Sequence, residues 1–224
     1  MDWPDPAEVR PRWNVAPSQD APVLRVGADG KPEIAELRWG FAAAWAGTGR
    51  SEGKGPTLAP INARSETAAT SRMFRAAMGS RRCIVPASGF YEWKPAVPAA
   101  GERAKATKHP HYIHASNDGI LLLAGLWEPS HGGGDSGTFA ILTTRPNALM
   151  TGLHDRMPVI VRPGDAAEWM RPSPLEDAPR YFEPYPAESM KAYRVSNRVN
   201  SPRNEGAGLI ERWADPEEAP GLFG

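Results

Sequence analysis

The sequence has 224 residues and a formal net charge of zero, because 26 Lys and Arg residues balance 26 Asp and Glu residues. This length is sufficient for one large domain with its own core. The charge balance excludes a protein that is basic over its whole surface, although it permits a local basic patch. The single cysteine, Cys83, excludes an internal disulfide and a cysteine-based zinc cluster. We therefore expect a reducing, cytoplasmic setting, with no signal peptide and no membrane span.

The first part of the chain predicts a hairpin, a helix and two strands. Residues 21–41 predict a β-hairpin, since two apolar-rich runs surround the turn sequence GADGK. Residues 65–80 predict one amphipathic helix, because apolar residues recur at every third or fourth position, and Ser65 or Thr67 would cap its start. Residues 81–94 predict two strands joined through PASG.

The rest of the chain predicts more strands than helices. Further strands are predicted over residues 109–116, 119–129, 137–146 and 157–163, and at the start of 190–200. Residues 164–172 predict a short helix with Asp165 in its first turn. Polar loops are expected at 96–108 and 131–137. The sequence contains no repeat and no shift in composition on the scale of a domain, so it indicates one mixed domain, mostly antiparallel sheet with a few helices.

Three polar residues stand in otherwise apolar surroundings, namely Asn62, Glu92 and His154. Asn62 follows a predicted strand, where an asparagine is more commonly a turn residue. Glu92 shares a strand face with Phe90. It either faces solvent or, if it is buried, has a raised pKa that suits proton transfer near neutral pH. His154, in the segment LHDRMP, is either a structural residue or a general acid or base.

Metal binding and cysteine catalysis have less support in the sequence. His109 and His111 would share one strand face, but His114 falls on the other, so we predict no metal site. Cys83 lies in an apolar strand, and no helix N-terminus follows it to lower the pKa of its thiol. We expect a buried and unreactive residue.

Aromatic residues and arginines accompany the polar clusters. Trp39, Trp45 and Trp93 each lie beside a polar cluster or a loop. Tryptophans mostly build cores, but an indole exposed beside arginines is a stacking platform for unpaired bases. The arginines that could contact phosphates are Arg64, Arg72, Arg75, Arg81, Arg82 and Arg156. Together these residues favour a focused groove for single-stranded nucleic acid.

The order of the motifs is more specific than any one of them. The segments RWNVAPSQ, RWGFAAAW, INARSETA, RRCIVPASGFYEWK, AGLWEP, LTT, LHDRMPVI and VSNRVN follow one another along the chain. In this order they resemble the SOS response-associated peptidase (SRAP) family, from about Arg12 to Trp213. The resemblance implies an α+β fold, a single SRAP domain over residues 1–224 with an antiparallel, barrel-like β-sheet core and a few helices.

The resemblance also implies a covalent reaction at abasic sites in single-stranded DNA. Family members use an N-terminal cysteine, whose α-amine attacks the open sugar aldehyde to give a Schiff base and whose thiol then closes a thiazolidine ring. Asn62 would orient that cysteine, Glu92 would shuttle protons at the amine, and His154 would assist opening of the sugar ring and the reverse reaction. A carboxylate and an imidazole suit these proton transfers.

The same resemblance implies a set of DNA contacts. They fall on Pro17, Trp45, Arg64, Arg72, Met73, Trp93, Thr143 and Arg156. The expected partner is single-stranded DNA that contains abasic sites. We expect no cofactor and no metal ion, a monomer, and a cytoplasmic, nucleoid-associated location.

The sequence departs from the family pattern at its N-terminus. Asp2 stands where the family has its cysteine, and the segment that begins Met-Cys-Gly-Arg is missing. Three explanations stay open at this point: a true start upstream, a trimmed chain, or a natural variant without the nucleophile. The intact remaining set of residues favours the first two.

Three functions from different classes follow. The first is an abasic-site-processing enzyme of the hydrolase or lyase class, which forms a covalent DNA crosslink and has an associated peptidase or autoprocessing activity. The second is a non-covalent binding module for single-stranded or damaged DNA, if the chain truly starts at Met1. The third is a cysteine protease that uses Cys83, which slow alkylation of this thiol in the native protein would exclude.

Overall fold

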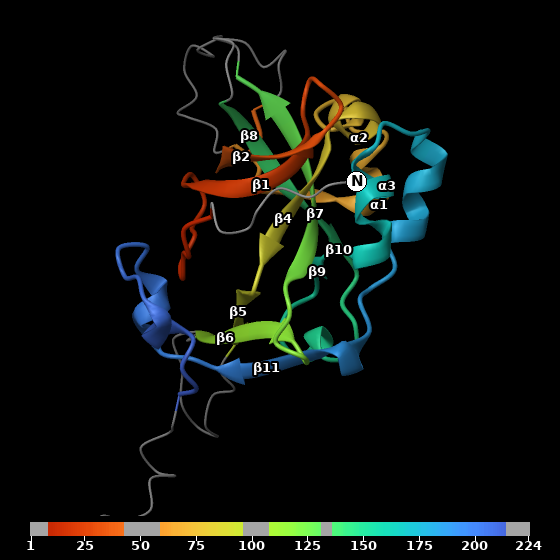
Figure 1. Cartoon of the computed structure of the whole chain (residues 1–224). Coiled ribbons are helices and arrows are strands. Elements are labelled where there is room, and N and C mark those ends of the chain that lie inside the picture. The colour runs from red at the N-terminus through yellow and green to blue at the C-terminus, as the bar shows by residue number, and fades with distance from the viewer. Residues whose placement is uncertain (1–8, 43–58, 96–107, 131–135, 214–224) are drawn as a thin grey trace, which may run out of the picture.

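A computed structural model describes residues 9–42, 59–95, 108–130 and 136–213 (Figure 1). The described strands are β1 (Asp20–Val26), β2 (Pro32–Trp39), β3 (Asn62–Arg64), β4 (Arg82–Ala87), β5 (Gly89–Pro95), β6 (Lys108–Ala115), β7 (Leu121–Pro129), β8 (Gly137–Thr144), β9 (Met157–Pro158), β10 (Ile160–Val161) and β11 (Met190–Arg194). The helices are α1 (Ser65–Ala68), α2 (Arg75–Ser80) and α3 (Ala166–Met170). Short 3-10 turns are η3 (Met150–Gly152), η4 (Pro163–Asp165), η5 (Leu175–Tyr181), η6 (Ala187–Ser189), η7 (Asn197–Asn200) and η8 (Ala207–Leu209).

The larger sheet closes into a barrel. Strands β7, β4, β1, β2 and β8 pair in that order, and β7 pairs with β8 to complete the ring. All of these pairings are antiparallel except that of β2 with β8. Strands β3 and β9 add to β8, and β10 adds to β7. The expected α+β fold with a barrel-like, mostly antiparallel core is therefore confirmed.

A second sheet of three strands lies beyond one end of the barrel, in the order β11–β6–β5 (Figure 1). Strand β4 leads directly into β5, so the barrel and the small sheet are joined by one nearly continuous run of chain. Side chains alternate between the two faces of β5. Phe90 packs against the cluster inside the barrel, whereas Tyr91 and Trp93 pack against a separate cluster that includes Val195 and Val199.

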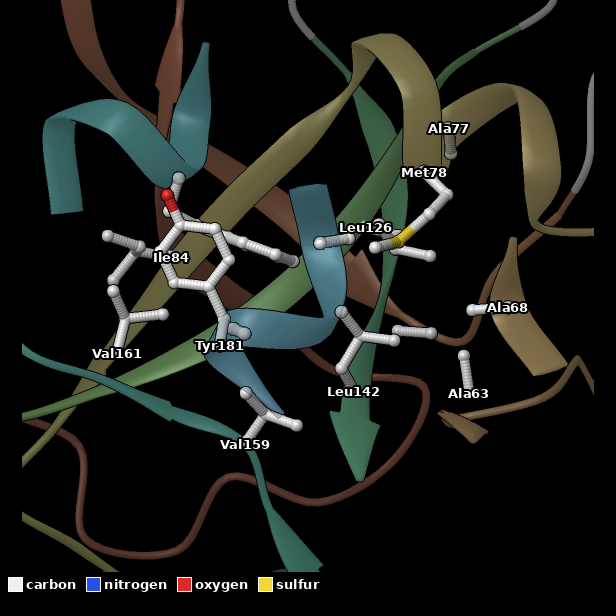
Figure 2. Close-up of a cluster of buried hydrophobic side chains, with 14 of the residues drawn as sticks. Ala63, Ala68, Ala77, Met78, Ile84, Leu126, Leu142, Val159, Val161 and Tyr181 are labelled. Carbon is white, nitrogen blue, oxygen red and sulfur yellow. The ribbon is translucent and has the colours of Figure 1, made fainter. Parts of the chain in front are cut away.

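The core consists of two large clusters that share the barrel strands. One contains residues from every strand of the ring, including Val23, Leu37, Cys83, Leu123 and Ile141, so it fills the barrel interior. The other lies on the opposite face of β4, β7 and β8, where α2, α3 and η5 cover it (Figure 2). Its labelled members include Met78, Ile84, Leu126, Leu142 and Tyr181.

The single helix predicted over 65–80 is wrong, because the chain forms α1 and α2 with a turn between them. Hydroxyl side chains in this turn bond to the backbone and compete with helical hydrogen bonds. The Thr70 hydroxyl donates to the Thr67 carbonyl at 3.2 Å, and the Ser71 hydroxyl accepts from the Met73 amide at 3.2 Å. The predicted cap is also wrong, since Arg64 is the N-cap residue of α1 and no side chain caps it.

The strand predicted over 157–163 is divided into β9 and β10. Val159 lies between them and bonds to two barrel strands, with its amide on the Leu142 carbonyl and its carbonyl on the Ala124 amide, each at 2.8 Å. The predicted hairpin and the two strands joined through PASG are confirmed. The short helix predicted over 164–172 is present as α3, but Asp165 is its N-cap residue and does not lie in its first turn. The two predicted polar loops lie mostly outside the described residues.

Candidate active site

Glu92 lies on β5 opposite His111 of β6 and is half-buried. Burial raises the pKa of its carboxyl group above the usual value, while the charges of His154 and Lys108 oppose this shift without cancelling it. Of the two alternatives for Glu92, solvent-facing or buried, the partial burial and the raised pKa agree with the second. His154 exerts the largest of these opposing charge effects, so its imidazole lies within electrostatic range of Glu92.

His154 lies in the irregular segment between η3 and β9, and 42% of its side chain is exposed. Its amide donates to the Met150 carbonyl at 2.8 Å. The ring nitrogen Nδ1 is 3.2 Å from Asp155 Oδ1, 3.1 Å from the Arg156 amide nitrogen and 3.3 Å from the Arg156 carbonyl oxygen. These neighbours occupy the Nδ1 side of the ring, and no hydrogen bond joins Nε2 to a described residue.

A cavity of about 600 Å³ separates the end of β5 from this segment. Its described lining residues are Trp93, Lys94, Pro95, Lys108, Pro146, Thr151, Gly152, Leu153, His154 and Asp155. Lys94 and Lys108 come from neighbouring strands, are exposed and form no ion pair with a described residue. Neither lysine was predicted from the sequence; the position of Lys94 directly after the motif YEW was a signal that could have identified it.

Asn62 is the first residue of β3 and lies opposite Ile141 of β8. Its side chain is exposed and forms no hydrogen bond within the described residues. The strand assignment of Asn62 contradicts a simple turn role. However, no described contact joins Asn62 to Glu92 or to His154, so the shared catalytic role that the family resemblance implies for these three residues stays a prediction.

Arg156 joins the His154 segment to β8 and α1. Its guanidinium donates to both carboxylate oxygens of Glu66, at 2.6 and 2.8 Å, and to the Thr143 carbonyl at 2.5 Å. Hydrogen bonding from Arg156 lowers the pKa of Glu66. Because most of the guanidinium donors of Arg156 bond to these partners, the main role of Arg156 is to fix the segment that carries His154. Its predicted contact with DNA would use the donors that remain.

The other residues predicted to contact DNA differ in accessibility. Pro17, Arg64 and Arg72 are exposed, Met73 is half-buried, and Thr143 is buried with only 8% exposure. Trp93 is half-buried and donates from its indole nitrogen to Asn200 Oδ1 at 2.7 Å. Trp45 lies outside the described residues.

Two arginines that were candidates for phosphate contacts have structural partners instead. Arg82 is only 1% exposed, and it donates to the Met78 carbonyl and the Ser173 hydroxyl, each at 2.7 Å. Arg81 forms an ion pair with Glu128 at 2.9 Å. The prediction that Arg82 could bind phosphate is wrong, because a fully buried guanidinium cannot reach a ligand.

Cys83 is fully buried in the barrel interior, as predicted. Burial raises the pKa of its thiol far above the usual value, so the thiolate needed for a protease nucleophile does not form. Within the described residues, no group of three or more His, Cys, Asp or Glu side chains could hold a metal ion. No helix in the same ranges is long and apolar enough to cross a membrane.

The raised pKa of Glu92 has a consequence for stability. Its ionised form is favoured in the unfolded chain relative to the folded protein, so its ionisation destabilises the fold as pH rises above the usual carboxyl range. We expect Glu92→Gln to have a higher Tm than the wild type at pH 8, and the difference to disappear near pH 4, where the carboxyl group is largely protonated in both states. Thermal unfolding at several pH values measures this, and a Tm difference that is independent of pH would contradict it.

Comparison with known proteins gives a consistent result. A model of the SOS response associated peptidase (SRAP) family matches residues 2–202. The chain is 40% identical over 211 residues to the abasic site processing protein YoqW of Bacillus subtilis (strain 168). The aligned segment covers 91% of this chain and 87% of that protein. It is 31% identical over 204 residues to the abasic site processing protein YedK of Escherichia coli (strain K12). This alignment covers 89% of this chain and 84% of that protein.

Solved structures with a similar fold include a protein from Bacteroides thetaiotaomicron, with a TM-score of 0.69 and 25% identity over 88% of this chain and 82% of that chain. A phage-related protein from Bordetella bronchiseptica has a TM-score of 0.66 and 30% identity over 84% of this chain and 83% of that chain. The likeness therefore extends over most of the chain.

Proposed function

Because the chain belongs to the SOS response associated peptidase family, we propose that it binds single-stranded DNA and processes abasic sites in it. The observation that carries this proposal is a half-buried carboxyl group of raised pKa, Glu92, on which the charge of His154 acts. His154 lines a cavity together with Trp93, the residue that follows Glu92 on β5. Relatives named abasic site processing proteins support the choice of substrate. The reaction class is that of an enzyme acting on the abasic sugar, as a lyase or hydrolase.

The proposed reaction begins at the abasic sugar, which exists as a closed ring and as an open aldehyde. His154 would transfer a proton between the ring oxygen and the anomeric hydroxyl and so promote opening. The α-amine of an N-terminal cysteine would then attack the aldehyde carbon. Glu92, which its raised pKa keeps protonated over a wider pH range, would donate the proton with which the hydroxyl leaves as water, giving the Schiff base.

Ring closure would complete the covalent link. The cysteine sulfur adds to the carbon of the protonated Schiff base, the thiol proton passes to the carboxylate of Glu92, and a thiazolidine with a neutral ring nitrogen forms. Asn62 would orient the amine, since its exposed amide forms no hydrogen bond within the described residues.

Strand binding would depend on the two lysines at the cavity and on Arg64, which is not among the cavity-lining residues. Arg64 is exposed at the end of β3, and Lys94 and Lys108 stand at the cavity wall beside Trp93. Ammonium and guanidinium groups placed this way would contact the phosphates on either side of the abasic sugar, and the Trp93 indole would stack with a neighbouring base.

Salt dependence tests this arrangement. When a substitution removes one phosphate interaction with a single strand, the slope of log Kd against log salt concentration falls by about 0.7. We expect a decrease of this size for Arg64→Ala and of about 1.4 for the double variant Lys94→Gln/Lys108→Gln. The matched control is Arg38→Ala, which removes a cation that already pairs with Asp20 on the β1–β2 hairpin. Slopes that match the wild type in all three variants would place the DNA elsewhere.

A non-covalent DNA-binding module is a second candidate, favoured by one observation. Cys83 is the single cysteine of the 224-residue sequence, and its thiol is buried in the barrel. A chain of these 224 residues would then hold an abasic strand without forming a stable covalent link to it. The two functions share the DNA contacts and differ in whether a covalent adduct survives on a denaturing gel.

A further inference from the structure

We propose that Glu66 is a positioning residue, which acts through Arg156 to hold the His154 imidazole with Nε2 available to the substrate. Glu66 lies in α1, and it is 90 residues from Arg156 in the sequence. The inference rests on the proposed function, because it assigns Glu66 a part in the proton transfers at His154.

The segment that carries His154 has few backbone anchors. At one end, the His154 amide bonds to the Met150 carbonyl. At the other end, Met157 of β9 pairs with Thr144 of β8. Asp155, between them, has a side chain that is 89% exposed. A segment held only at its ends needs a further restraint if the imidazole is to keep one orientation.

The Arg156 side chain supplies that restraint. Its guanidinium donates hydrogen bonds to both carboxylate oxygens of Glu66 and to the carbonyl of Thr143. A bidentate pair of this kind is the strongest geometry for an arginine and a carboxylate. Only 22% of the Arg156 side chain is exposed. Because Thr143 belongs to β8 and Glu66 to α1, the loop is fixed to two elements of the folded barrel.

The restraint passes from Arg156 to the imidazole through the backbone. The amide and carbonyl of Arg156 and the carboxylate of Asp155 all lie within 3.3 Å of His154 Nδ1. The Arg156 amide can donate a hydrogen bond to Nδ1 when this nitrogen is unprotonated. The Arg156 carbonyl oxygen and the Asp155 carboxylate can accept one when Nδ1 carries a proton. In both states the ring orientation leaves Nε2 as the nitrogen that exchanges a proton with the substrate.

The first test separates chemistry from binding in a chain that carries an N-terminal cysteine. In Glu66→Gln, the amide cannot accept two charge-assisted bonds from Arg156, so we expect the single-turnover rate of adduct formation to fall about tenfold. The Kd for an intact single strand should stay at the wild-type value. In a His154→Ala background, Glu66→Gln should cause no additional loss, because residues that act as a unit are not additive.

The matched control is Glu168→Gln. Glu168 forms an ion pair with Arg180 at 2.7 Å, and its side chain is 58% exposed, compared with 51% for Glu66. This substitution should leave the rate unchanged. A full additional loss in the His154→Ala background, or a rate loss explained by weaker DNA binding, would overturn the role assigned to Glu66.

The second test needs no activity and therefore distinguishes this inference from the proposed function. In the 224-residue chain, the imidazole resonances of His154 are assigned by comparison with His154→Gln in nitrogen-15 spectra. We expect these resonances to shift in Glu66→Gln and to stay in place in Glu168→Gln. If the wild type does not act on abasic DNA, the proposed function fails, but the imidazole spectrum still tests whether Glu66 positions His154. Unchanged His154 resonances in Glu66→Gln would refute this role of Glu66.

Discussion

A polypeptide of these 224 residues should bind single-stranded DNA and yet form no heat-stable adduct with an abasic site. A thiazolidine requires an amine and a thiol on adjacent carbons, which only an N-terminal cysteine offers. Cys83 has its nitrogen in a peptide bond and its thiol in the barrel interior, so it cannot substitute. A lysine such as Lys94 could form a Schiff base, but this bond hydrolyses unless it is reduced.

The same domain preceded by a segment that begins Met-Cys-Gly-Arg should form the adduct, once the initiator methionine is removed. Glu92→Gln in this longer chain should slow the reaction by about 100-fold, the lower end of the range from 10² to 10⁴ that a positioned proton-transfer group contributes. Denaturing electrophoresis after incubation with an abasic oligonucleotide measures both effects. A stable higher band from the 224-residue chain without a reductant would show that another nucleophile is at work.

Filling the cavity should have the second large effect. Gly152 lines the cavity beside His154, and a Cβ atom added to it would meet no heavy atom within 4 Å, so the fold should accept a larger side chain there. Leucine would occupy the space that we assign to the abasic sugar. Because a displacement of the reacting sugar by about 1 Å can reduce a rate by 10²-fold, Gly152→Leu should slow adduct formation by at least about that factor.

The control for this substitution is Gly164→Leu. Gly164 lies in η4, away from the cavity-lining residues, and its added Cβ would likewise meet nothing within 4 Å. We expect Gly164→Leu to form the adduct at the wild-type rate. The Tm of both variants verifies that they are folded, and a wild-type rate in a folded Gly152→Leu would exclude the cavity as the place of the reaction.

The strands could be predicted from the sequence because apolar runs and turn residues identify each of them locally. The break in the helix over 65–80 could not, since the hydroxyls of Thr70 and Ser71 outweigh an apolar periodicity that continues through them. The burial of Arg82 was missed for another reason. Its partner Ser173 comes from a distant part of the chain, and an arginine in a sequence carries no sign of burial.

The candidate site was predicted residue by residue, but not its connections. Glu92 lies on β5 of the small sheet and His154 in the segment between η3 and β9. The charge effect of His154 on Glu92 therefore arises only when these two parts of the chain pack in the fold. The bidentate pair of Glu66 and Arg156 joins residues 90 positions apart, so no local pattern reveals it. Long-range pairs of this kind form only when the barrel closes, and the strand order that closes it could not be predicted from the sequence.

The cavity lined by Trp93 and His154 should receive the abasic sugar of a single strand. The most direct measurement is the ratio of two Kd values of the 224-residue chain, for an intact single strand and for the same strand with one stable tetrahydrofuran abasic analogue. We predict tighter binding of the analogue strand by the wild type, loss of this preference in Gly152→Leu, and similar intact-strand affinity in both proteins. Equal affinities in the wild type, or a preference that survives the filled cavity, would contradict this assignment of the cavity.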